Sequence, residues 1–164
     1  MNTKAVRIYG VKDLRLEEFE LPTMKDDEIE ARIVTDSLCM STYKVSNQGE
    51  KHKKLPNDLK NHPVIMGHEV CGEIVAKGEG VEGFEIGDVV AVCPLHAKDG
   101  TTPGYTRDGG YGTMTTAPVE QLVKVPEGVT YAQAAAATDA GATAYHAVVT
   151  VGEVKTGMKV GIIG

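Results

Sequence analysis

One short stretch constrains this chain more than any other. Residues 67–78 read Gly-His-Glu-Val-Cys-Gly-Glu-Ile-Val-Ala-Lys-Gly, or G-H-E-x-x-G-x-x-x-x-x-G. The apolar residues Val70, Ile74 and Val75 are typical of a strand, and the glycines allow the backbone to approach a metal or another strand closely. A neutral imidazole at the start of such a strand can bind a metal, with a carboxylate beside it. The alternative is a glycine-rich β-turn with an incidental His-Glu pair.

The rest of the chain predicts a mainly β fold. Apolar residues alternate or form short runs between Gly and Pro residues. We expect strands at residues 4–9, 14–21, 28–38, 67–78, 88–93, 113–117 and 121–125. Helices are expected at 41–49, at 131–137 and at about 142–151. The first of these is expected to begin with Ser41 as N-cap and to end at Gly49. This order predicts an α+β fold, a partly open β-barrel with appended helices.

Length, composition and charge indicate which binding partners and cellular locations the chain can have. The chain has 164 residues, 41% hydrophobic and 24% charged, which is enough for one domain with a core. Its net charge is −6 without a long basic run, which argues against nucleic acid and anionic membranes as partners. No apolar stretch approaches the ~20 residues of a membrane span, and the first residues lack a signal-peptide core. Three cysteines, an odd number, indicate reduced thiols and a cytoplasmic location.

Two further segments carry metal donors. The first segment, Cys39-Met40-Ser41-Thr42, lies before His68 in the sequence. The second begins at Asp139, after His68, and ends at Tyr145. With these residues, the chain from about 4 to 164 resembles the zinc-dependent, medium-chain alcohol dehydrogenase family. Residues 67–81 fit that family's zinc signature. The Cys39 segment is similar to its C-x-[ST]-D motif, with Thr42 in place of Asp. The Asp139 segment is similar to its third-ligand segment, where Cys is usual and Asp occurs in some members.

The resemblance implies a chaperonin-10-like catalytic domain with one catalytic zinc held by Cys39, His68 and Asp139. It also implies that Ser41 relays the proton of the alcohol and that Thr143 contacts the nicotinamide ring of NAD or NADP. Lys44 takes the position where many members carry a His that passes the proton to solvent. Glu69 is expected beside the metal, where it tunes the charge without binding permanently.

Other interpretations of these residues stay open. Cys39 is equally typical of an inert buried thiol, and Asp139 before Ala-Gly-Ala-Thr is a good N-cap for the second helix. Cys71 and Cys93 are expected to be strand residues without a ligand role. The remaining histidines are expected to be solvated or locally hydrogen-bonded; they are His52, His62, His96 and His146.

A second, structural zinc is not expected. The family often carries four closely spaced cysteines for it, whereas residues 91–112 here contain only Cys93. One thiol cannot make a four-cysteine site. We therefore expect a shortened loop without structural zinc.

The end of the chain resembles the start of another domain. Residues 158–164 are similar to the first strand of a dinucleotide-binding domain, with Gly164 at the first glycine of a G-x-G-x-x-G loop. We therefore expect a catalytic domain over 1–157 and a strand that is frayed or paired with a neighbouring chain at 158–164. NAD or NADP would bind only to the full-length enzyme, and the fragment alone would be inactive and could form homo-oligomers.

A basic loop gives the best indication of substrate. Residues 47–54 read Asn-Gln-Gly-Glu-Lys-His-Lys-Lys and follow the helix after Cys39, and this half of the chain is similar to sorbose-1-phosphate reductase relatives. The loop can hold a sugar phosphate through its charges, or it is simply a solvated loop. We therefore expect a small alcohol, polyol or sugar phosphate as substrate. The rival hypotheses are a metal-free barrel-type binding module and the zinc-free quinone-reductase branch of the same superfamily.

Overall fold

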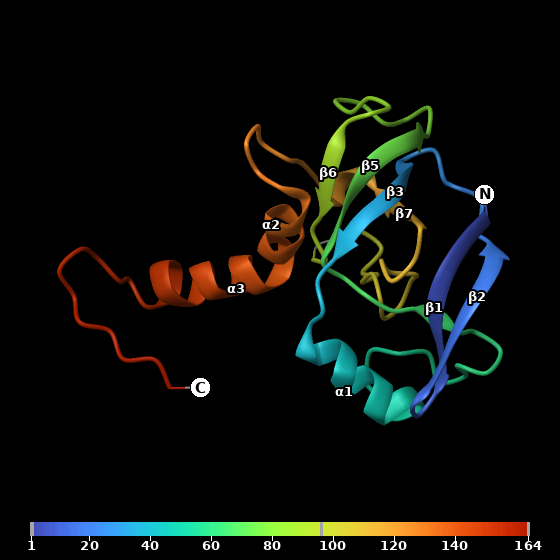
Figure 1. Ribbon diagram of the computed structural model, residues 1–164, viewed down its shortest axis with the longest axis horizontal. Helices are drawn as coiled ribbons and strands as arrows, with labels where there is room; N and C mark the ends of the chain where they lie inside the picture. Colours follow the sequence, from blue (N-terminus) through green and yellow to red (C-terminus); the bar gives the residue numbers. More distant parts are fainter. Residues whose placement is uncertain (1, 96, 164) are drawn as a thin grey trace.

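The computed structural model describes residues 2–95 and 97–163, and its strands form two antiparallel sheets (Figure 1). The smaller sheet has the order β2-β1-β4, with β1 at Asn2–Gly10, β2 at Asp13–Glu20 and β4 at Val64–Ile65. The larger has the order β7-β3-β5-β6-β8. Its strands are β3 (Glu28–Asp36), β5 (Val70–Lys77), β6 (Val89–Val92), β7 (Met114–Pro118) and β8 (Leu122–Lys124).

The predicted mainly β fold with appended helices is confirmed, and the two sheets are not closed into a barrel. All seven expected strands are present, but the strand expected from residue 67 begins at Val70. Gly67 has φ +91°, outside the range of a strand, which explains the later start. The short β4, which pairs with β1, was not predicted.

The glycines of the 67–78 stretch have a packing reason. A Cβ on Gly67 would collide with the Asp36 carboxylate and the Tyr111 ring, and a Cβ on Gly72 would collide with the backbone oxygen of Arg32. Gly72 faces Ile33 across the β3–β5 pair, so β5 approaches β3 closely there. This close approach brings the chain before β5 next to the end of β3, where Cys39 follows.

Helix α1 (Met40–Gln48) comes directly after β3 and is followed by a 3₁₀ turn at Gly49–Lys51. The prediction of Ser41 as N-cap is wrong, because the N-cap is Cys39, with φ −88° and ψ 140°. Gly49 ends the helix with φ 52°, as predicted. A second 3₁₀ turn, Val119–Gln121, links β7 and β8.

The two predicted C-terminal helices are one uninterrupted helical run. It comprises α2 (Tyr131–Ala136), a π-helical turn (Ala137–Gly141), α3 (Ala142–Tyr145) and a second π-helical turn (His146–Val151). Thr130 begins it with a capping box, in which its hydroxyl accepts from the Gln133 N–H at 3.3 Å. In Figure 1, α2 lies beside the larger sheet and α3 extends away from it.

The two largest of four apolar clusters pack the larger sheet and α1. The first fills the larger sheet and contains Ile29, Ala31, Val70, Ile74, Val81, Val90, Val92, Ala117 and Leu122. The second packs α1 and the loop after it against β1 and β4, and contains Ile8, Val45, Leu55, Leu59, Val64, Met66 and Tyr105. Met66 of the second cluster and Val70 of the first lie on either side of His68 in the sequence.

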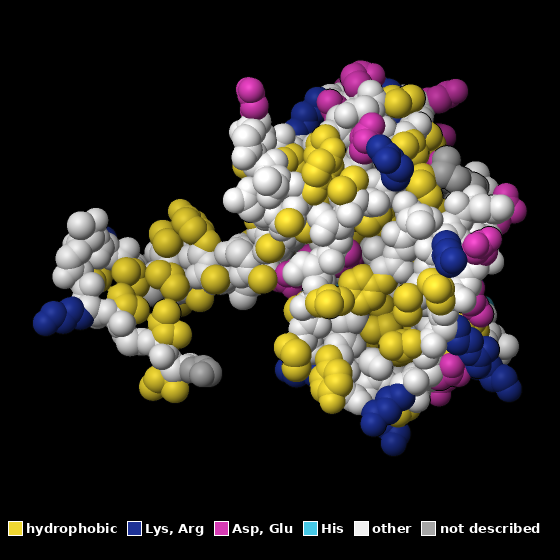
Figure 2. Space-filling view, viewed as in Figure 1, with side chains coloured by type: hydrophobic (Ala, Val, Ile, Leu, Met, Phe, Trp, Pro, Cys, Tyr) yellow, Lys and Arg dark blue, Asp and Glu magenta, His cyan; other side chains and the backbone are white. Residues whose placement is uncertain are grey.

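The helical run after α2 forms an apolar arm outside both clusters. Val148, Val149 and Val151 are exposed on it, and Figure 2 shows hydrophobic side chains along this projection. Residues 158–163 form no strand, and Ile162 and Ile163 are exposed. Among residues 2–95 and 97–163, no helix has the length and apolar character needed to cross a membrane.

Candidate metal centre

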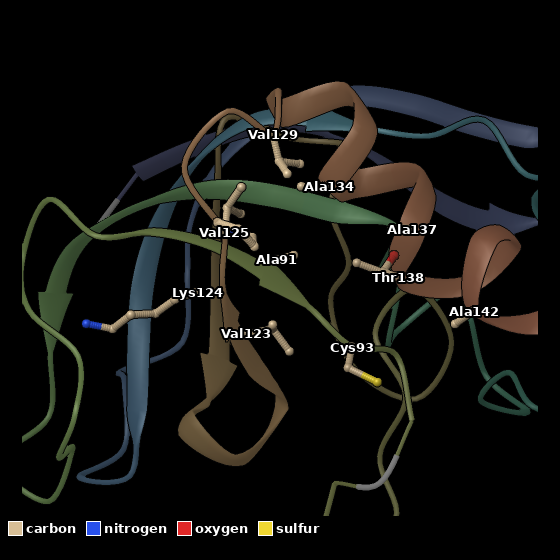
Figure 3. Close-up of a pocket in the computed structure, with 11 residues that line it drawn as sticks. Ala91, Cys93, Val123, Lys124, Val125, Val129, Ala134, Ala137, Thr138 and Ala142 are labelled. Carbon is tan, nitrogen blue, oxygen red and sulfur yellow. The ribbon is translucent and has the colours of Figure 1, made fainter. Parts of the chain in front are cut away.

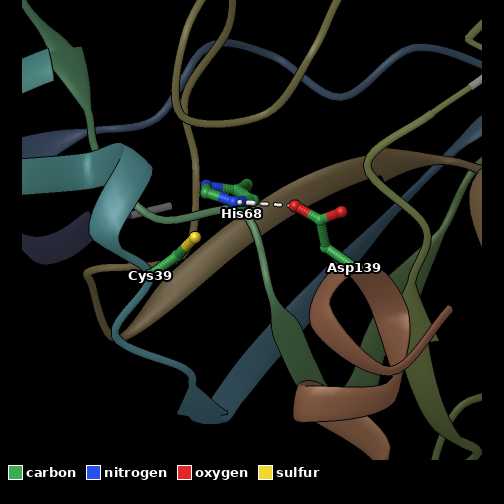
Figure 4. A group of neighbouring side chains, drawn as sticks. All are labelled: Cys39, His68 and Asp139. Carbon is green, nitrogen blue, oxygen red and sulfur yellow. Dashed lines mark ion pairs between the residues drawn. The ribbon is translucent and has the colours of Figure 1, made fainter. Parts of the chain in front are cut away.

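Three segments far apart in the sequence meet at one point. Cys39 lies between β3 and α1, His68 precedes β5, and Asp139 lies in the first π-helical turn of the helical run. One donor atom from each, a sulfur, a ring nitrogen and a carboxylate oxygen, lies within 4.8 Å of the other two (Figure 4). This is the one such metal-compatible group that the described residues contain. All three side chains point toward a common space in that view.

Short polar contacts link the three donors. His68 is 3% exposed, and its Nε2 lies 3.2 Å from Asp139 Oδ2. The Ser41 hydroxyl donates to Cys39 Sγ at 3.0 Å and lies 3.4 Å from His68 Nε2. Ser41 therefore touches two of the three candidate ligands from the first turn of α1.

Glu69 ties the Asp139 segment to the His68 segment. Its side chain is 1% exposed, and Oε1 accepts a hydrogen bond from the Ala140 N–H at 2.9 Å. Thr143, one helical turn later, donates its hydroxyl to Asp139 Oδ1 at 3.1 Å. Two polar contacts therefore fix the position of the Asp139 carboxylate, one through the backbone and one directly.

The interpretation of Asp139 as a helix cap is wrong. The helical run begins at Thr130, so Asp139 lies inside it, and the residue before α3 is Gly141 without a side-chain cap. The Asp139 carboxylate instead faces His68 and Thr143. The π-helical turn at Ala137–Gly141 is the local feature that carries this side chain.

Asp36 contacts the site through the backbone of Glu69. The sequence did not identify it as a site residue. Its Oδ1 accepts the Glu69 N–H at 3.2 Å, while Oδ2 is buried without a hydrogen-bond partner. Burial is the main cause that raises the pKa of Asp36 to about 7, against the opposing hydrogen bond from Glu69. A buried carboxyl in such a place carries a proton over much of the acidic range.

Tyr105 was missed as well, because it lies in residues 91–112, for which the sequence predicts only a shortened loop. Its ring centroid is 5.4 Å from that of His68, and the side chain is 7% exposed. Burial raises the pKa of the Tyr105 hydroxyl, and a hydrogen bond with Ser41 opposes this rise. No local sequence signal marks this contact, since only the folded loop brings Tyr105 to His68.

The other expected residues lie away from the group. Lys44 is exposed on α1. Among the described residues, it forms no hydrogen bond or ion pair with Cys39, His68 or Asp139. Cys71 is buried in β5, where burial raises the pKa of its thiol to about 11, and Cys93 is half-buried after β6. His62 and His146 are exposed. His96 lies outside the described residues.

A separate apolar hollow lies beside the helical run. It measures about 440 Å³ and lies between β6, β8 and the helical run, with Cys93 and Thr138 at one end (Figure 3). None of the three candidate ligands lines it. The candidate chemistry and this hollow are therefore distinct features of the chain.

Comparison with known proteins decides the family. The alcohol dehydrogenase GroES-like domain matches residues 25–127. The chain belongs to this family. That match includes the Cys39 and His68 segments of the GroES-like domain and ends before the helical run that carries Asp139.

Three relatives illustrate the similarity. The L-sorbose 1-phosphate reductase of Klebsiella pneumoniae is 61% identical over 77 residues, 47% of this chain and 19% of that protein. The mannitol-1-phosphate 5-dehydrogenase of Aliivibrio fischeri is 38% identical over 120 residues, 71% of this chain and 28% of that protein. The solved 2R,3R-butanediol dehydrogenase of Bacillus subtilis matches 82% of this GroES-like chain with a TM-score of 0.72 and 30% identity, over 43% of its own length.

These comparisons bear directly on the predictions. The expected resemblance to medium-chain alcohol dehydrogenases and to sorbose-1-phosphate reductase relatives is confirmed. The names of the relatives describe oxidoreductases of a sugar phosphate, a polyol phosphate and a diol. The chain spans less than half the length of each of these three proteins.

Proposed function

We propose that this chain is the catalytic domain of a zinc-dependent, NAD(P)-linked alcohol or polyol dehydrogenase that acts in the cytoplasm. The observation that carries the proposal is the meeting of Cys39, His68 and Asp139, with their donor atoms within 4.8 Å of one another. Family membership supports it, since the relatives named above are oxidoreductases.

The donor set suits one catalytic zinc. Zinc accepts thiolate, imidazole and carboxylate ligands, and catalytic sites use three protein ligands and keep a fourth position open. Cys39, His68 and Asp139 would supply the three ligands. A zinc ion held there would act as a Lewis acid that lowers the pKa of an alcohol hydroxyl. A structural zinc is not part of the proposal, because Cys93 is the only thiol in residues 91–112.

We assign the transfer of the alcohol proton to Ser41. Its hydroxyl lies 3.0 Å from Cys39 Sγ and 3.4 Å from His68 Nε2, so a substrate hydroxyl entering the same space would meet it. Oxidation of an alcohol to a carbonyl releases a proton from oxygen and a hydride from carbon. Ser41 would accept the proton and pass it toward solvent, and the hydride would reduce the nicotinamide of NAD or NADP.

The surroundings of two further residues add to the roles expected of them. Thr143 binds Asp139, so we assign it the orientation of that ligand in addition to any contact with nicotinamide. Lys44 is exposed, so a proton route that ends there would pass through solvent.

Cobalt substitution tests the ligand set directly. Cobalt(II) replaces zinc in such sites, and a thiolate ligand gives it an intense absorption band. The wild-type chain loaded with one cobalt should show this band, and Cys39→Ser should lose it. Cys93→Ser is the matched control, because Cys93 lies outside the group, and it should keep the band. A band that survives Cys39→Ser, or that depends on Cys93, would refute the proposed site.

A further inference from the structure

A compact basic segment lies against the same tyrosine that contacts the candidate metal centre. Residues 51–54 read Lys-His-Lys-Lys and begin in the 3₁₀ turn after α1. The His52 ring stacks on Tyr105, with centroids 5.6 Å apart and an interplanar angle of 29°. Lys54 Nζ lies 5.1 Å from the centre of the Tyr105 ring. Tyr105 therefore contacts both His68 and two basic side chains.

Hydrogen bonds and buried neighbours hold the backbone of this segment in place, while its lysine side chains are exposed. Leu55 and Leu59, directly after it, are 6% and 0% exposed and belong to the same apolar cluster as Tyr105. The Leu55 N–H donates to the His52 carbonyl at 3.0 Å, and the Lys54 N–H donates to His52 Nδ1 at 3.3 Å. With Nδ1 acting as acceptor, the neutral His52 ring carries its proton on Nε2, which makes that atom a donor.

The positive charge of the segment has no internal partner. Among the described residues, Lys51, Lys53 and Lys54 form no ion pair with a carboxylate. The whole chain carries a net charge of −6, so a cluster of unneutralised lysines is a local exception. Burial, followed by the charges of Lys54 and Lys53, lowers the pKa of His52.

Lysine ammonium groups beside a histidine N–H form a typical recognition set for phosphate. We propose that His52 and Lys54, held against Tyr105, bind the phosphate group of a phosphorylated sugar or polyol whose reacting carbon reaches Cys39, His68 and Asp139. This inference rests on the proposed dehydrogenase function. Tyr105 forms the wall between the two ends of the substrate, with the basic pair on its ring and His68 beside it.

A phosphate at this place can come from the substrate or from a dinucleotide cofactor, and binding experiments separate the two. Calorimetric titration of the zinc-loaded chain compares D-glucitol 6-phosphate, D-glucitol and NADP⁺. Inorganic phosphate is added as a competitor. The wild-type chain should bind the phosphorylated polyol at least about tenfold more tightly than the polyol, as expected for a charge-assisted contact. Phosphate should compete for the site.

The variants locate the contact. Lys54→Gln and His52→Gln should each weaken binding of D-glucitol 6-phosphate several-fold and leave D-glucitol unchanged. Lys60→Gln, an exposed lysine nearby in the chain, is the matched control and should have no effect. Equal affinity for both polyols, or equal effects of Lys54→Gln and Lys60→Gln, would overturn the proposal. Loss of NADP⁺ affinity alone in Lys54→Gln would also overturn it, because the site would then belong to the cofactor.

The His68→Ala variant separates this inference from the function on which it rests. If His68→Ala loses zinc but still binds inorganic phosphate in a Lys54-dependent manner, the phosphate subsite stands independently of the metal. If the wild-type chain binds zinc but shows no Lys54-dependent phosphate binding, the dehydrogenase proposal stands and the phosphate subsite falls.

Discussion

Glu69 connects two parts of the candidate metal centre through a single hydrogen bond. Its buried carboxylate accepts the Ala140 N–H, next to Asp139, while its own backbone follows His68. In Glu69→Ala the Asp139 segment loses this tether, and we expect zinc affinity to fall about 10- to 100-fold, the range seen when groups that orient metal ligands are removed. Glu69→Gln keeps a side-chain acceptor and should lose less.

Competition with a chromophoric chelator measures both affinities. Equal zinc affinity of Glu69→Ala and the wild-type chain would show that the hydrogen bond to Ala140 does not position Asp139.

The raised pKa of Asp36, about 7, makes the stability of the metal-free chain depend on pH. Because this value lies above the unfolded value of about 4, the folded chain binds more protons in between, and stability falls as pH rises from about 4 to 7. Asp36→Asn removes this slope. The free energy of unfolding of Asp36→Asn minus that of wild type should therefore increase from pH 4 to pH 7. The increase is at most about 4 kcal/mol, which corresponds to a shift of three pKa units.

Urea unfolding of both proteins in chelator, at several pH values, checks this expectation. A difference between Asp36→Asn and wild type that stays constant with pH would mean that Asp36 is ionised normally in the folded chain.

The residue scale also shows what sequence could and could not reveal. Cys39, His68 and Asp139 stood out because their local motifs resemble those of a known family, and the fold brings them together. Tyr105 and Asp36 carry no such motif. Their contacts with His68 and Glu69 arise from the packing of loops and strands that are distant in sequence.

The helical run is the element on which the position of Asp139 depends. Its capping box at Thr130 satisfies backbone N–H groups that begin α2, which lies against the larger sheet. Thr130→Ala should lower the free energy of unfolding by about 1 kcal/mol, the usual effect of losing such a cap. Thr150→Ala, in the exposed second π-helical turn, is the matched control and should change stability far less.

Chemical denaturation followed by circular dichroism compares the two variants. An equal loss in Thr130→Ala and Thr150→Ala would contradict the role assigned to the capping box.

Elements were predicted well where one local pattern decides them. Alternating or continuous apolar residues gave the strands, and Gly49 gave the end of α1. The two-residue β4 is too short to show an alternation of apolar and polar residues, and it forms a strand by pairing with β1. The continuous helical run was missed because Asp139-Ala140-Gly141 reads as a helix start, whereas the backbone there adopts a π-helical turn that accommodates these residues.

At the scale of the whole molecule, the candidate metal centre lies where the end of β3, the chain before β5 and the start of the helical run meet, while the rest of that run projects outward. The apolar arm exposes Val148, Val149 and Val151, and apolar exposure of this kind favours association with another surface. The division at residue 157 and the dinucleotide-binding role of 158–164 stay predictions. The candidate metal centre takes all three of its donor atoms from described residues of this chain.

Metal content tests the central claim most directly. The chain, purified without chelator and supplied with zinc, is measured by elemental analysis beside His68→Ala. We predict about one zinc per wild-type chain, as for a single three-ligand site, and essentially none in His68→Ala. Absence of zinc from the wild-type chain, or equal zinc in both proteins, would contradict a metal centre built from Cys39, His68 and Asp139.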